Sequence, residues 1–76
     1  MGRRLPILKA KELIRVLRAL GFIFMRQKGS HAFYQHPVTG KSTVVSIHPG
    51  EDIDRSLLKA ILQETNVDPE EFLKYL

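Results

Sequence analysis

Residues 22–48 read FIFMRQKGSHAFYQHPVTGKSTVVSIH, and this stretch decides the fold. Three segments rich in aromatic and β-branched residues are separated by a Gly-Ser pair and by a loop containing Pro and Gly; they are residues 22–28, 31–36 and 42–48. Such segments favour strands, and the residues between them favour turns. Because strands with connections this short pair as neighbours, we predict a three-stranded antiparallel sheet.

Helices are predicted on both sides of this stretch, over residues 10–20, 55–65 and 69–75. In the first predicted helix, apolar residues recur at the i, i+3, i+4, i+7 spacing of one helix face. Asp54 and Asp68 are suitable N-caps for the second and third helices. In the second helix we expect four buried side chains: Leu57, Leu58, Ile61 and Leu62. The order α-β-β-β-α-α predicts an α+β fold with the helices packed on one face of the sheet, leaving the other face for a partner.

The chain has 76 residues, which is enough for one domain, so we expect a single domain over residues 1–76. Cysteine is absent from the sequence, which excludes disulfides and thiolate metal sites. The apolar runs are shorter than the roughly 20 residues that a membrane helix needs. Since the first residues also lack the pattern of a signal peptide, we expect a cytoplasmic protein that does not engage a membrane.

Charge is distributed unevenly along the chain. Residues 1–30 hold eight Lys and Arg against one acidic residue, whereas residues 51–76 hold seven acidic residues against three basic ones. A cationic region of this kind favours a polyphosphate partner, because neutralised phosphates release counterions. Three of the basic residues follow one face of the first helix and are candidate RNA contacts: Lys11, Arg15 and Arg18.

The Gly29-Ser30-His31 segment is the candidate site of chemistry. RNA is cut through its own 2′-hydroxyl when a base removes the hydroxyl proton and an acid protonates the leaving oxygen. Imidazole suits either transfer, because its ordinary pKa of about 6.5 lies near neutral pH. His31, which follows a basic turn that contains glycine, is on these grounds a candidate catalytic residue, and whether it would act as acid or base is left open. Arg26 and Lys28 are expected to stabilise the phosphate charge, and Gly29 and Ser30 to approach the RNA backbone.

We interpret the other two histidines, His36 and His48, separately from His31. His36 precedes a proline at a strand end and is expected to be solvated, whereas His48 is a possible supporting residue of the site. The spacing of the three histidines matches no compact ligand motif, so we expect neither a metal nor another cofactor.

Phe33 and Tyr34 alternate along the second strand, so their side chains point to opposite faces of the sheet. We expect Phe33 in the core and Tyr34 exposed, where it is free to stack on a base.

The sequence resembles the HicA family of toxins from toxin–antitoxin pairs. The matching segments run nearly the length of the chain: Leu20-Gly21-Phe22, Arg26-Gln27-Lys28-Gly29-Ser30-His31, Ile47-His48-Pro49-Gly50, Leu57 with Ile61-Leu62, and Glu70-Glu71-Phe72. The sequence departs from the family at Arg55 and Ser56, where a Gly-Thr pair is common.

The resemblance implies a fold like that of double-stranded-RNA-binding domains (dsRBD-like). It also implies an mRNA interferase, an endoribonuclease that cuts mRNA without a metal and whose catalytic residue is His31, the histidine of Gly-Ser-His. A HicB-type antitoxin is the implied protein partner. Two other classes remain open at this point: a non-catalytic RNA-binding module of the same fold, and a protein-interaction or DNA-binding component of a regulatory complex.

Overall fold

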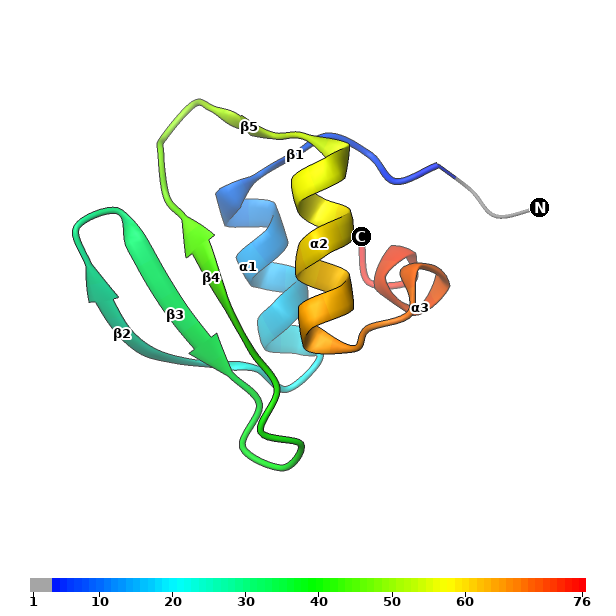
Figure 1. Ribbon diagram of the computed structural model, residues 1–76. Coiled ribbons are helices and arrows are strands. Elements are labelled where there is room, and N and C mark those ends of the chain that lie inside the picture. Colours follow the sequence, from blue (N-terminus) through cyan, green and yellow to red (C-terminus); the bar gives the residue numbers. More distant parts are fainter. Residues whose placement is uncertain (1–3) are drawn as a thin grey trace.

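The computed structural model describes residues 4–76 and has the α+β architecture expected (Figure 1). Its elements, in chain order, are β1 (Leu8–Lys9), α1 (Ala10–Ala19), β2 (Ile23–Lys28), β3 (His31–Gln35), β4 (Ser42–Ser46), β5 (Asp52–Ile53), α2 (Arg55–Thr65) and α3 (Pro69–Leu73). The prediction of three central strands followed and preceded by helices is confirmed, and the arrangement is consistent with a dsRBD-like fold.

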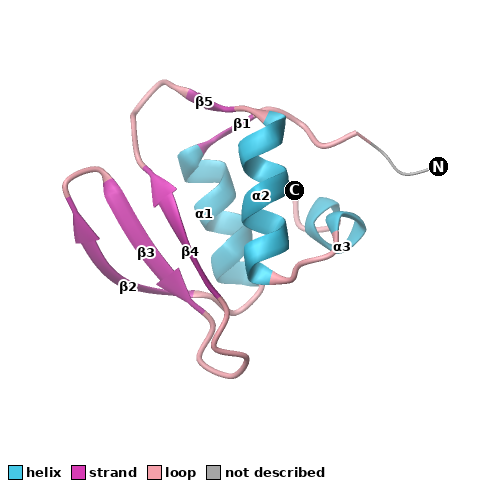
Figure 2. Cartoon of the chain, in the orientation of Figure 1, coloured by secondary structure: helices cyan, strands magenta, loops and turns pink. Residues whose placement is uncertain are grey.

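The main sheet has the order β2-β3-β4, with both strand pairs antiparallel. Helices α1 and α2 lie on one side of it, next to β4, and β2 is the strand furthest from them (Figure 2). The side chains that face the helices are buried: Ala32 and Tyr34 from β3, and Thr43 and Val45 from β4. We call this the inner face of the sheet and the opposite side the outer face.

The two C-terminal helices begin where the capping residues predict. The Asp54 carboxylate accepts a hydrogen bond of 2.8 Å from the Leu57 backbone N–H, and the Asp68 carboxylate accepts one of 2.8 Å from Glu70 N–H. The buried residues of α2 follow one stripe at i, i+3, i+4 and i+7: Leu58, Ile61, Leu62 and Thr65. Leu57 lies off this stripe and is 45% exposed, so the prediction that it is buried was wrong.

A second, two-stranded sheet was not predicted. β1 and β5 pair antiparallel, with Leu8 opposite Ile53 and Lys9 opposite Asp52. Leu8 and Ile53 are buried in the core, and the Lys9 ammonium donates to the Asp52 carboxylate and to the Gly50 carbonyl. The ladder therefore ties the start of α1 to the start of α2. Within residues 4–76, every helix is too short or too polar to cross a lipid bilayer.

Candidate functional site

The turn between β2 and β3 holds His31 in a fixed place. Lys28 and His31 are the last pair of this hairpin and enclose the two-residue loop Gly29-Ser30. Gly29 has φ +59°, a left-handed value at the first loop position, where hairpin turns favour glycine. On the other side, Ile47 N–H donates to the Ser30 carbonyl at 2.7 Å. His31 is thus held at the first position of the central strand, with its side chain exposed.

The register of the hairpin places Arg26 and Lys28 on the face of His31, and an irregularity in β2 turns Phe24 to the other face. The register shifts between Phe24 and Arg26, so that Met25 is an extra residue. Beyond this bulge, Arg26 lies opposite Phe33, and Lys28 lies opposite His31. Directly opposed residues point to the same side of a sheet. Arg26 and Lys28 therefore project from the outer face with His31, whereas Phe24, on the other side of the bulge, lies opposite Tyr34 on the inner face.

The outer face presents a compact set of side chains around His31. The Arg26 guanidinium carbon lies over the Phe33 ring, 4.7 Å from its centroid. From β4, Val44 and Ser46 lie opposite Phe33 and His31. In the described part of the chain, α1 and α2 pack on the other side of the sheet, so this face is open to a ligand. The candidate site is therefore Arg26, Lys28, His31 and Phe33, with Val44 and Ser46 beside them.

The structure reverses the expected roles of Phe33 and Tyr34. Tyr34 is 6% exposed and packs in the core, whereas Phe33 is half-buried on the outer face. The physical reason is alternation: His31 points to solvent, so Phe33, two residues later, must lie on the same side. Phe33 was therefore missed as a site residue, although the position of His31 in the strand was the signal. Val44 and Ser46, which carry no motif, were missed as well.

The basic residues of α1 lie elsewhere. Lys11, Arg15 and Arg18 are exposed along the helix, as expected, but α1 packs on the inner side of the sheet. Arg15 donates a long hydrogen bond of 3.4 Å to the Tyr75 carbonyl, near the end of the chain. The fold therefore does not bring these three side chains onto the face that carries His31.

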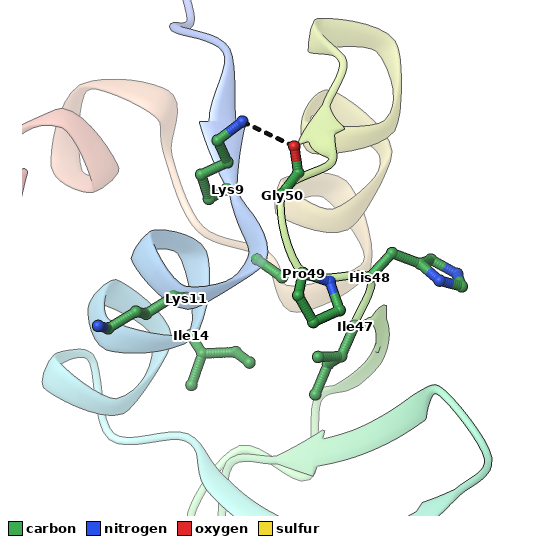
Figure 3. Close-up of a pocket in the computed structure, with 8 residues that line it drawn as sticks. Lys9, Lys11, Ile14, Ile47, His48, Pro49 and Gly50 are labelled. Carbon is green, nitrogen blue, oxygen red and sulfur yellow. Dashed lines mark hydrogen bonds between the residues drawn. The ribbon is translucent and has the colours of Figure 1, made fainter.

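His48 follows β4, two residues after Ser46, and is exposed. It lies at the rim of a largely apolar cavity of about 520 Å³, which is lined by Lys9, Ala10, Lys11, Ile14, Ile47, His48, Pro49 and Gly50. Figure 3 shows the His48 ring pointing away from Lys11 and Ile14. His48 therefore lies next to this cavity and just beyond the end of β4, the strand that pairs with the strand of His31. Its role in supporting the His31 site stays a proposal.

His36 has a structural place, and the expectation that it is solvated was wrong. Its Nδ1 accepts hydrogen bonds from Val38 N–H at 3.1 Å and Thr39 N–H at 3.3 Å. The ring also packs edge-on against Phe22, with centroids 5.2 Å apart. His36 therefore organises the loop between β3 and β4. Among residues 4–76, no three His, Asp or Glu side chains converge as metal ligands do.

The comparison with protein families agrees with this arrangement. A family model described as the HicA toxin of bacterial toxin–antitoxin systems matches residues 10–67, from the start of α1 to just beyond α2. No curated protein sequence gives a significant match to the chain. The family match covers well over half of the 76 residues and includes the complete main sheet. The chain therefore belongs to the HicA family: it is the toxin of a toxin–antitoxin pair, which implies an antitoxin partner and an RNA substrate.

Proposed function

We propose that the chain is an endoribonuclease that cleaves mRNA without a metal ion, and that His31 is its catalytic residue. The observation that carries this proposal is the position of His31 on an open sheet face, directly opposite Lys28 and on the same side as Arg26. An exposed imidazole beside two cationic side chains is suited to a phosphodiester, because charge stabilisation and proton transfer are needed at the same place.

The proposed reaction uses the RNA's own 2′-hydroxyl. The 2′-oxygen loses its proton and forms a bond to the adjacent phosphorus, and the bond from phosphorus to the 5′-oxygen breaks as that oxygen takes up a proton. His31 performs one of these two proton transfers. Arg26 and Lys28 stabilise the negative charge that grows on the phosphate oxygens. The products are a 2′,3′-cyclic phosphate and a 5′-hydroxyl end.

The test is cleavage of end-labelled RNA by the purified chain in the presence of a chelator. His31→Ala should lower the cleavage rate by about 100-fold or more, the usual contribution of general acid–base catalysis. His48→Ala is the companion variant, and a smaller loss there would assign it the supporting role. A substrate with a 2′-deoxynucleotide at the cut site should resist cleavage. Equal cutting by the parent and His31→Ala would refute the role of His31.

A non-catalytic RNA-binding module is the alternative, because the same cationic face would bind phosphates without cutting them. It predicts salt-sensitive binding, no product after long incubation, and only small changes in affinity with His31→Ala. The two functions are therefore separated by one observation, the appearance of cleaved ends that depends on His31.

We further propose that the antitoxin partner is of the HicB type and that it covers the edge strand β2. All six residues of β2 are exposed, and Ile23 and Met25 are large apolar side chains at 47% and 44% exposure. An exposed apolar edge strand is suited to pairing with another protein. Co-expression with a HicB-type antitoxin tests this: the antitoxin should suppress toxicity, and Met25→Glu should weaken the complex while leaving RNA cleavage intact.

A further inference from the structure

We propose that Arg26 and Phe33 form a stacking subsite for one unpaired RNA base, next to the phosphate that His31 acts on. The substrate would then be RNA that is single-stranded at the cut. This inference rests on the proposed function, because it uses His31 as the reference point for the scissile phosphate. It adds a binding site and a substrate class that charge alone does not specify.

The contact between the two side chains provides the platform. The guanidinium of Arg26 lies over the ring of Phe33 at 4.7 Å, while Arg26 remains exposed to solvent. Bases stack on aromatic rings and on guanidinium planes, and the two surfaces are combined here. Because Phe33 packs against one face of the guanidinium, Arg26 loses less freedom when a base covers the other face. The N–H groups at the edge of the guanidinium then remain free to donate to the neighbouring phosphate.

The spacing along β3 connects this platform to His31. His31 and Phe33 are two residues apart on one strand and point to the same face, so their Cα atoms are separated by about 7 Å. That separation is comparable to the length of one nucleotide in an extended RNA strand. A base held by Arg26 and Phe33 would therefore position the neighbouring phosphate at His31, between Lys28 and Ser46.

Phe24, the other phenylalanine of the hairpin, does not offer an equivalent surface. Phe24 lies opposite Tyr34, on the inner side, and the two rings pack edge-on with centroids 5.7 Å apart. Phe24 is nevertheless exposed, so it is a matched control for the loss of an exposed aromatic ring. A base in a duplex is already stacked and paired, so the platform selects a base that has left the stack.

The experiment measures binding on the His31→Ala background, so that the RNA stays intact. The probe is a short single-stranded RNA carrying 2-aminopurine, whose fluorescence falls on stacking; the same RNA annealed to its complement is the second probe. Phe33→Leu should weaken single-strand binding by about 5- to 100-fold and remove the quenching. Arg26→Lys, which keeps the charge but loses the planar surface, should also reduce the quenching. Phe24→Leu should change neither quantity.

The outcomes separate this subsite from the proposed catalysis. If Phe33→Leu and Arg26→Lys both bind and quench like the background protein, the stacking subsite is refuted, even when the parent cleaves RNA through His31. If duplex and single-stranded RNA bind equally tightly, the proposed substrate class is refuted. If the parent shows no cleavage but Phe33→Leu abolishes quenching, the subsite stands and the catalytic proposal fails. Thermal unfolding of each variant verifies that the sheet is intact.

Discussion

Lys28 and His31 are held opposite each other by a loop of only two residues, Gly29 and Ser30. The loop length fixes the register of the hairpin, so the cation and the imidazole have no freedom to slip along the strands. Apart from Gly29 and its two chain neighbours, no described residue has an atom within 4 Å of the place where a Gly29 side chain would begin. The backbone conformation, rather than crowding by the protein, is therefore what requires glycine at this position.

Substitution of Gly29 tests that requirement. Gly29→Val places a β-branched residue at φ +59° and should lower the free energy of unfolding by about 1–2 kcal/mol, because side chains clash with the backbone in the left-handed region. Gly29→Asn should cost less, since Asn tolerates that region. Urea unfolding of both variants measures the difference. If both variants lost the same unfolding free energy, the turn would be able to relax, and its backbone conformation would not be what holds the hairpin in register.

We expect the charge of Lys28 to speed the proposed cleavage by stabilising the phosphate, and not by stabilising the fold. Lys28→Gln removes the cation opposite His31 and should reduce the cleavage rate by about 10-fold or more, with Lys28→Arg restoring much of it. Lys41→Gln is the matched control, because Lys41 is exposed in the loop between β3 and β4, at the end of the sheet opposite His31. A similar loss in Lys28→Gln and Lys41→Gln would indicate a general charge effect instead.

Several features were predictable because they depend on local chemistry. Gly29-Ser30 marks a turn, and Asp54 and Asp68 cap helices wherever the chain places them. The β1–β5 ladder was missed because strands of two residues show no alternation. The bulge at Met25 was missed for a related reason: nothing in a six-residue strand reveals one extra residue. Without it, strict alternation from the Lys28–His31 pair would place Phe24 on the outer face with Arg26 and His31.

The close approach of Gly21 to His36 predicts that a small side chain would disturb the fold. A Cβ added at Gly21 would lie 2.7 Å from His36 Nε2, and Gly21 has φ +102°. Gly21→Ala should therefore be destabilising by about 1–3 kcal/mol.

A double-mutant cycle separates the two causes. His36→Ala removes the clash, so combining it with Gly21→Ala should cost less than the two single changes added together. Simple additivity would show that the backbone conformation alone is responsible. Neither change should abolish cleavage once corrected for the folded fraction, since His36 lies at the far end of β3 from His31.

The basic stripe of α1 is expected to contribute affinity without contributing to the chemical step. Lys11, Arg15 and Arg18 are exposed on the helical side of the sheet, so phosphates bound there lie away from the strand that carries His31. Removing one cation that binds a phosphate should reduce the slope of log affinity against log salt by about 0.7 for single-stranded RNA, so replacing all three with Gln should reduce it by about 2. Cleavage of saturating RNA in a single turnover should proceed at the parent's rate. An unchanged salt slope would remove α1 from the RNA interface, whereas a slower single turnover would mean that RNA bound on α1 also positions the scissile phosphate.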